Sequence, residues 1–177
     1  MQDAGYEFPR IHLLGTRVNK GTYLPRATLD EATTRRLAVS AENTDRLKRL
    51  LLEGFGQGDM SVLDEVVAED FIEHQQGLPQ GREGLKEGIR DVRRAFPDLS
   101  YTVVQMVADG DKLWGHFRAR GTNEGPFMGQ DPTGKVMEID VMEIDVIDIS
   151  RFEDGKMVEH WGVPDRLGTL LQLGFFP

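Results

Sequence analysis

The sequence predicts an α+β fold, in which N-terminal helices pack on a strongly curved antiparallel sheet of four to five strands and enclose a central pocket. Two observations lead to this prediction. Apolar residues recur at helical spacing as far as Phe96, and after Pro97 the hydrophobic period changes to two and stays there. Helices followed by a run of strands joined by short turns are typical of a layered α+β domain.

Length and composition restrict the classes of partner. The chain has 177 residues, of which 39% are hydrophobic and 29% charged, enough for one domain with a real core. A net charge of -9 argues against nucleic acids and anionic membranes as partners, since both need clustered Lys and Arg. No run approaches the roughly 20 apolar residues of a membrane span, and no signal peptide is recognisable. We therefore expect a cytoplasmic protein.

Residues 1–40 are predicted to be an N-terminal arm with a short helix, and residues 41–177 the main domain. The start of the arm contains Gly, Pro and aromatic residues without a sustained period, which indicates an extended segment. Its apolar residues Ile11, Leu13 and Leu14 suggest packing on the main domain or on a neighbouring subunit.

Capping signals and apolar spacing predict the helices. A Thr-x-x-Glu capping box at Thr28 starts a short helix, and Asp59 is placed to cap another. Pro97 stops the helix that precedes it. The predicted helices cover residues 28–39, 43–55, 59–67, 84–96 and 166–173. Asp165 comes directly before the last of these, so we interpret it as an N-cap in preference to a catalytic residue.

Alternating hydrophobicity predicts the strands, with a tight Asp154-Gly155 turn inside the final hairpin. The predicted strands are 100–108, 112–121, 136–148 and the two arms of the hairpin that carries His160 and Trp161. The third contains Val-Met-Glu-Ile-Asp twice in tandem, and its alternation slips twice, so two β-bulges are expected. Its acidic side chains are interpreted as a solvated face, which is favoured over a metal site. Asp148, nearest the hairpin, is the exception.

Histidines and one carboxylate are the candidates for acid/base chemistry, because histidine titrates near neutral pH and a carboxylate fixes its tautomer. They are His74, His116, His160 and Asp148. A purely structural hydrogen-bonding role is the alternative for each. Alternation puts Val158, His160 and Gly162 on one face of the last strand and Met157, Glu159 and Trp161 on the other. It does not say which face lines the pocket.

Motifs for other chemistry are missing. The chain has no cysteine, no Gly-x-Ser-x-Gly elbow, no phosphate loop, no dinucleotide fingerprint and no His-Glu-x-x-His helix. The histidines also lack the short spacing of metal ligands. We therefore expect neither a metal nor a cofactor.

Several stretches together resemble the SnoaL-like family (polyketide cyclase-like, ester cyclase) of the NTF2-like superfamily. They are Glu69-Asp70-Phe71-Ile72-Glu73-His74, Phe96-Pro97-Asp98-Leu99, Gly125-Pro126-Phe127-Met128-Gly129 with Pro132-Thr133-Gly134-Lys135, and Asp154 to Trp161 with Gly168 and Gln172-Leu173-Gly174. The match covers residues 43 to 174. The resemblance implies an NTF2-like cone with a buried pocket, a homodimer formed through the sheet, and cofactor-free ring closure by aldol addition in which an Asp transfers the proton.

Two positions depart from the pattern of these cyclases. Their acid/base Asp falls on Gly162, and an Asn that helps them bind substrate falls on Gly88. Glycine offers neither a proton nor a side-chain hydrogen bond, so the standard mechanism does not transfer directly. The alternative to an enzyme is a non-catalytic small-molecule-binding or assembly module that has lost the cyclase Asp.

The favoured hypothesis is a cofactor-free enzyme that cyclises, isomerises, dehydrates or hydrolyses a small, largely apolar, carbonyl-containing metabolite. His160 is the expected general base, Asp148 orients it, and His74 or Arg118 stabilises developing negative charge on oxygen. The residues expected to bind substrate are His116, Arg118 and Trp161.

Overall fold

The described part of the chain forms two compact units, residues 1–39 and 40–177. The computed structural model describes residues 12–18, 22–28, 30–134, 136–140, 148–162 and 164–175, with the backbone alone for 12–18, 22–28 and 136–140. The first unit contains an antiparallel hairpin of β1 (His12–Val18) and β2 (Thr22–Thr28). We expected an extended arm there and no strand pair. The paired residues Gly15 and Pro25 explain the difference, because both weaken a strand pattern in the sequence.

One continuous helical rod replaces the first two predicted helices. Helix α1 (Glu31–Arg49) runs directly into a π-helical segment, η1 (Leu50–Gln57). Asn43, the predicted start of the second helix, lies in the middle of this continuous helix, and its side chain is buried. The N-cap is Asp30, whose Oδ1 accepts a hydrogen bond from the Thr33 amide at 2.6 Å. The predicted capping box was therefore wrong.

The remaining helices follow their sequence signals closely. They are α2 (Met60–Val66), α3 (Gly81–Ala95) and α4 (Arg166–Leu173). Asp59 caps α2 through a 2.9 Å hydrogen bond from the Ser61 amide, as predicted. Asp165 caps α4 through a 2.5 Å hydrogen bond from the Gly168 amide, which confirms its structural role. Among the described residues, no helix is both long enough and apolar enough to span a membrane.

The main sheet is mixed, which corrects the expectation of a purely antiparallel one. Its strands are β3 (Val67–Glu73), β4 (Ser100–Asp109), β5 (Lys112–Thr122), β6 (Val136–Asp140), β7 (Asp148–Glu153) and β8 (Lys156–Trp161). The order is β3-β8-β7-β5-β4, and β6 pairs with β5. All pairs are antiparallel except β3 with β8. The segment that forms β3, VAEDFIE, does not alternate apolar and polar residues, so no strand was predicted there.

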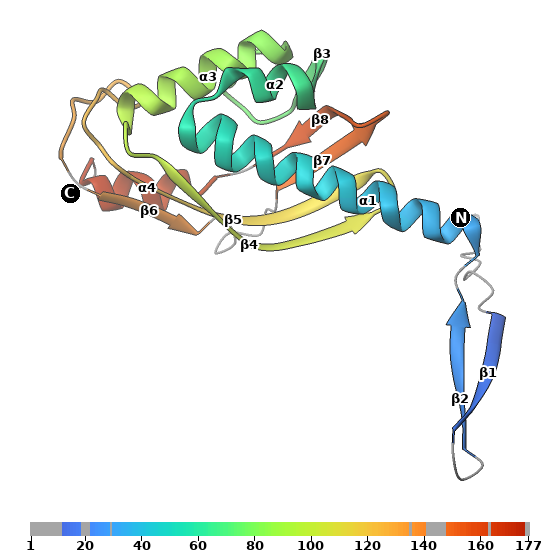
Figure 1. Ribbon diagram of the computed structural model, residues 1–177. Coiled ribbons are helices and arrows are strands. Elements are labelled where there is room, and N and C mark those ends of the chain that lie inside the picture. The colour runs from blue at the N-terminus through green and yellow to red at the C-terminus, as the bar shows by residue number, and fades with distance from the viewer. Residues whose placement is uncertain are drawn as a thin grey trace, which may run out of the picture. The chain divides into compact units, whose positions relative to one another are not determined.

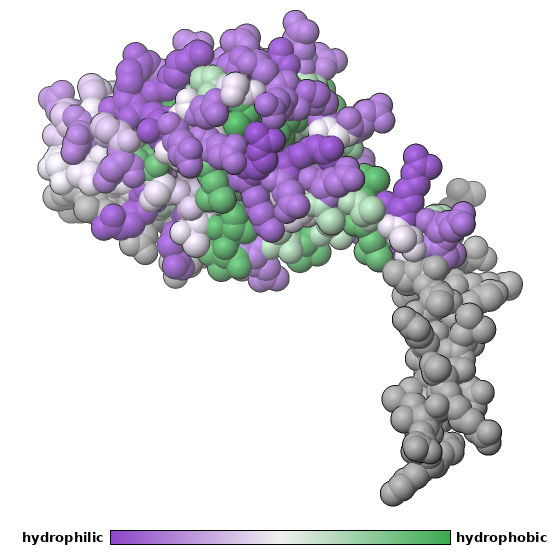
Figure 2. Space-filling model, viewed as in Figure 1, coloured by the Kyte–Doolittle hydropathy of each residue, from purple (hydrophilic) through white to green (hydrophobic). Residues whose placement is uncertain are grey.

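The helices and the sheet form the two layers of the cone. In Figure 1, α2 and α3 lie over one side of the sheet formed by β5, β7 and β8. Figure 2 shows that hydrophilic side chains cover much of this helical layer on its outer side. The second copy of the tandem repeat and its two predicted bulges lie largely in residues 141–147, outside the described residues.

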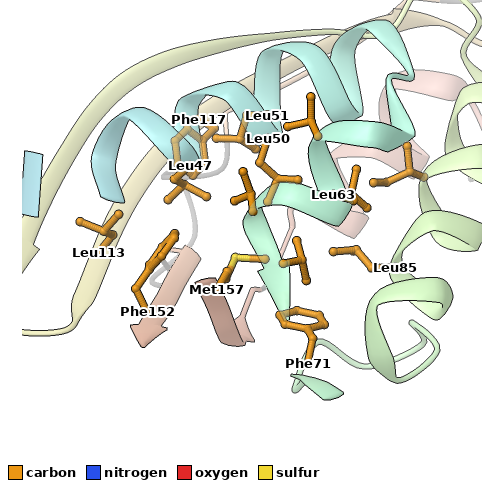
Figure 3. Close-up of a cluster of buried hydrophobic side chains, with 14 residues drawn as sticks. Leu47, Leu50, Leu51, Leu63, Phe71, Leu85, Leu113, Phe117, Phe152 and Met157 are labelled. Atoms are coloured by element: carbon orange, nitrogen blue, oxygen red, sulfur yellow. The ribbon is translucent and has the colours of Figure 1, made fainter. Parts of the chain in front are cut away.

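Apolar side chains fill the space between the layers. Figure 3 shows leucines from α1, η1, α2 and α3 directed toward aromatic and methionine side chains of the sheet. Phe117 on β5 and Phe71 on β3 are almost fully buried. Gly115 makes room for the Phe117 ring, because a Cβ on Gly115 would lie 2.0 Å from its Cζ. This core fixes which face of each strand points inward.

The outer face of the sheet carries an apolar row across four strands. Val107 on β4 pairs with Trp114 on β5, Trp114 with Ile149 on β7, and Ile149 with Trp161 on β8. Val107 is 52% exposed and Trp114 38% exposed. We refer to these four residues as the outer apolar row. Ile149 and Trp161 are half-buried. Neighbouring apolar side chains at the surface are a feature of interaction sites.

Candidate active site

A cavity of about 530 Å³ lies between the helical layer and the inner face of the sheet. Pockets of a few hundred Å³ hold small organic molecules. Most of its wall is apolar, supplied by η1, α3 and the inward side of the strands. The residues with polar side chains along the wall are Glu73, Gln75, Tyr101, Asp148, Ser150, His160, Arg166 and Thr169. A larger hollow of about 860 Å³ beside α3 is open to solvent and lined mainly by charged side chains.

A bulge in β8 decides that His160 points into this cavity. On β7, Phe152 pairs with Met157 and its neighbour Arg151 pairs with Glu159, so Val158 is the extra residue. Met157 is buried in the core and His160 lines the cavity, three residues later. The sequence-based alternation, which put Met157 and His160 on opposite faces, is corrected by this bulge.

His160 lies between two carboxylates. Its Nδ1 is 2.9 Å from Glu73 Oε1 and 3.1 Å from Oε2, and its Nε2 is 3.6 Å from Asp148 Oδ1. The first contact is a hydrogen bond, and the second is an ion-pair distance longer than a hydrogen bond. The Glu73 side chain is fully buried, whereas those of His160 and Asp148 are 17% and 21% exposed. We refer to Glu73, His160 and Asp148 as the carboxylate–histidine row. Of these three residues, Asp148 and His160 are the ones that a molecule in the cavity can reach.

Backbone contacts hold the buried carboxylate in place. Glu73 Oε1 also accepts a hydrogen bond from the Gln75 amide at 2.7 Å. The side-chain amide of Gln80 bonds both ways with the Glu73 backbone, at 3.0 and 2.6 Å. Parallel pairing of β3 with β8 sets Glu73 beside His160, its register partner. Glu73 is thus fixed before any ligand arrives.

The two carboxylates of the carboxylate–histidine row favour the protonated form of His160. Burial lowers the pKa of His160, but contacts with Asp148 and Glu73 outweigh it and raise the pKa from 6.5 to about 10. At neutral pH the ring is therefore an imidazolium, with one N–H directed at each carboxylate. An imidazolium donates protons and cannot accept one, so the expected role of His160 as general base requires revision.

Gly162 lies next to the carboxylate–histidine row. A Cβ at this position would lie 2.6 Å from Asp148 Oδ1, 2.6 Å from Gln75 Oε1 and 2.8 Å from His160 Cε1. The space in front of Gly162 is therefore filled by the ends of these three side chains. Asp148 reaches it from β7, the strand next to β8 in the sheet.

Two of the predicted site residues stack on the other side of β8, outside the cavity wall. The His74 and Trp161 rings lie parallel with centroids 4.5 Å apart, and Lys112 Nζ is 5.6 Å from the Trp161 ring. His74 is exposed and bonds through its backbone amide to the His160 carbonyl at 2.9 Å. Neither ring lines the cavity: Trp161 follows the inward His160, and His74 follows the inward Glu73, so both point to the opposite face.

His116 and Arg118 also lie on the outer face of the sheet. On β5 the inward positions are Leu113, Phe117 and Ala119, all buried, and the two predicted residues alternate with them. Neither forms part of the cavity wall, so the expectation that they bind a substrate there is not met. Within the described residues, no three His, Asp or Glu side chains gather in a way that would hold a metal ion.

Sequence reasoning missed Glu73, Gln75 and Tyr101. Glu73 had a usable signal, since it lies in a segment that resembles the family, two residues after the apolar Phe71. It was overlooked because β3 was not predicted as a strand. The other two gave no signal of their own in the sequence.

Comparisons with known proteins agree with this geometry. The model of the family described as SnoaL-like polyketide cyclase matches residues 45–173, well over half of the chain. The structure of TsrD from Streptomyces laurentii is 27% identical, with a TM-score of 0.66, and the match covers 84% of this chain and 100% of that one. Comparison with curated protein sequences gives no match.

Two further solved structures from Streptomyces are similar. IdmH from Streptomyces antibioticus, a proposed polyketide cyclase, is 34% identical over 75% of this chain and 98% of its own, with a TM-score of 0.64. AclR from Streptomyces galilaeus, a proposed hydroxylase, is 25% identical over 78% of this chain and 99% of its own, with a TM-score of 0.66.

Proposed function

Because the chain belongs to the SnoaL-like polyketide cyclase family, we propose that it is a cofactor-free acid/base enzyme acting on an apolar carbonyl-containing metabolite, and that Asp148 is its proton acceptor. The observation that carries the proposal is the Glu73–His160–Asp148 row at the wall of a largely apolar cavity. The proposal extends to secondary metabolism, since one similar structure is a proposed polyketide cyclase.

Asp148 is the better base of the two accessible groups. Its side chain is partly exposed and lines the cavity, whereas the His160 imidazolium has no free lone pair with which to accept a proton. A carboxylate is a suitable base for a carbon made acidic by two flanking carbonyl groups. Glu73 keeps the imidazolium charged and oriented, which in turn holds the Asp148 carboxylate.

The proposed reaction needs no external reagent. Asp148 takes a proton from the acidic carbon, and the resulting enolate carbon attacks a second carbonyl within the same molecule. The alkoxide formed takes a proton back from the Asp148 carboxylic acid, with His160 as an adjacent donor. Ring closure then leaves every proton accounted for, and the enzyme returns to its starting state.

Gly162 fits this proposal. The resemblance places the cyclases' acid/base Asp on this position, where the present chain has no side chain. The Asp148 carboxylate occupies the volume that a residue 162 side chain would enter, 2.6 Å from the position of its Cβ. We therefore propose that the proton-transfer role has moved to Asp148 on the neighbouring strand.

Asp148→Asn tests the proposal. Wild-type and variant protein are incubated with a panel of aryl β-keto esters that bear a second ketone, and products are followed by mass spectrometry. Loss of a general base is expected to lower turnover by about 10²- to 10⁴-fold. The matched control is Glu159→Gln on the outer side of β8, which is expected to retain turnover.

Two outcomes would argue against this function. Unchanged turnover in Asp148→Asn would exclude Asp148 as the base. Tight binding of the esters without conversion by the wild type would favour a non-catalytic binding module, for which the missing side chain at residue 162 is the supporting observation.

A further inference from the structure

We propose that Tyr101 is the hydrogen-bond donor that binds the carbonyl oxygen of a substrate in the cavity, and that it is a catalytic residue of this site. The inference deepens the proposed function and rests on it for the chemistry, although its test does not depend on turnover. Tyr101 lies on β4, which is the edge strand of the sheet, three positions from the strand that carries His160.

The Tyr101 hydroxyl makes no hydrogen bond with any residue in the described part of the chain. The hydroxyl is nevertheless not among the fully buried polar atoms. Tyr101 lines the cavity, and its register partner Ala119 is an inward residue that lines it too. Tyrosine hydroxyls in protein interiors usually have a hydrogen-bond partner, so this hydroxyl is suited to bond an acceptor atom of a molecule in the cavity.

The ring that carries this hydroxyl is held firmly. Tyr101 packs against both hydrophobic clusters of the main domain. Its ring meets Phe55 of η1 edge to face, with centroids 5.7 Å apart and planes at 74°. On β5 its register partner is Ala119, a small residue that also lines the cavity. A donor fixed by packing needs little reorganisation when a ligand binds.

The phenol stays neutral over the working pH range. Burial raises the pKa of Tyr101, and the negative charge of Asp148 raises it further. A neutral phenol donates one hydrogen bond, and the partner that this donor requires is an acceptor such as a carbonyl oxygen. Tyr101 and Asp148 both line this cavity.

The two groups complement each other chemically. When Asp148 removes a proton from the carbon next to a carbonyl, negative charge develops on the carbonyl oxygen. A hydrogen bond from Tyr101 to this oxygen becomes stronger in the transition state than in the bound substrate. Removal of a single donor of this kind lowers turnover by roughly 10²- to 10³-fold in other enzymes.

A matched pair of ligands tests the hydrogen bond without turnover. The probes are 2-acetylnaphthalene and 2-isopropenylnaphthalene, which have nearly the same shape but present C=O and C=CH₂ respectively. Their dissociation constants are measured by fluorescence for the wild type, Tyr101→Phe and Thr169→Val. Thr169 is the control, because it is another hydroxyl residue of the cavity wall and its hydroxyl already donates a hydrogen bond to the Asp165 carbonyl at 2.6 Å.

The wild type is expected to prefer the ketone by about three- to tenfold, the range for one neutral hydrogen bond. Tyr101→Phe keeps the ring packing and is expected to remove this preference while it leaves the affinity for the alkene unchanged. Thr169→Val is expected to keep the preference, since the Thr169 hydroxyl is already bonded to the backbone. A preference that survives in Tyr101→Phe, an equal loss of affinity for both probes, or no preference in the wild type would each overturn the proposal.

Asp148→Asn, measured both in the turnover assay with the keto esters and in this binding assay, separates this proposal from the proposed function. If Asp148 is not the base, turnover persists in that variant and the ketone preference of Tyr101 is unaffected. If Tyr101 is not the donor, the preference persists in Tyr101→Phe whatever happens to turnover.

Discussion

The charge of His160 can be tested directly by Glu73→Gln, which removes the buried negative charge and keeps the shape of the side chain. The folded-state pKa of His160 is raised from 6.5 to about 10 by its two carboxylates, against the effect of burial. Because the folded value is the higher one, the stabilisation is complete below pH 6.5 and is lost as the pH rises toward 10.

The magnitude follows from the same interval. Each pH unit between the unfolded and folded pKa corresponds to about 1.4 kcal/mol, so the total is at most about 5 kcal/mol. The free energy of unfolding of the wild type is therefore expected to fall between pH 7 and pH 9. In Glu73→Gln the pKa of His160 is lower, and the slope over this range is expected to become shallower.

Urea denaturation at several pH values measures the slope, and proton NMR of the imidazole ring measures the pKa of His160. The chain has four histidines, so a His160→Asn variant identifies the resonance. Glu159→Gln, on the outer side of the same strand, is the control that keeps the wild-type slope. If His160 titrates at or below pH 6.5 in the wild type, the reasoning about the carboxylate–histidine row is refuted.

Two further predictions concern Gly162 and the outer apolar row. Gly162→Ala is expected to lower turnover by up to about 100-fold, because the added Cβ would displace the ends of the Asp148 and Gln75 side chains. The free energy of unfolding is expected to change by only about 1 kcal/mol. Unchanged turnover would show that the position of the Asp148 carboxylate is not critical. We also propose that the outer apolar row forms a homodimer interface, so Trp114→Glu is expected to convert a dimer into a monomer in analytical ultracentrifugation. A wild type that sediments as a monomer, or a dimer that survives this substitution and Val107→Glu, would contradict the proposal.

Local signals in the sequence were sufficient for many elements. The predicted bounds of α4 agree with the structure, and its cap and that of α2 are the predicted aspartates. The Asp154-Gly155 turn is also as predicted, and both residues have positive φ, as a tight hairpin turn requires. These features depend on neighbours within a few residues, which a sequence displays directly.

The helical rod and the parallel strand were not predictable in the same way. Asn43 looks like the start of a helix, but tertiary packing buries it within one continuous helix. Strand β3 is held by its pairing with β8, whose residues lie far along the chain. Strand propensity depends on such partners more than on the segment itself, so its sequence carries only a weak signal.

The sequence by itself determined the inventory of this site: a carboxylate at position 148, histidines at 74, 116 and 160, and no side chain at 162. The tertiary structure decided which of them meet. A one-residue bulge at Val158 turns His160 inward, and β3 brings up Glu73 from 87 positions away to bond to it. Alternation along a strand specifies relative faces only, and burial between two carboxylates, which sets the charge of His160, exists only in the folded chain.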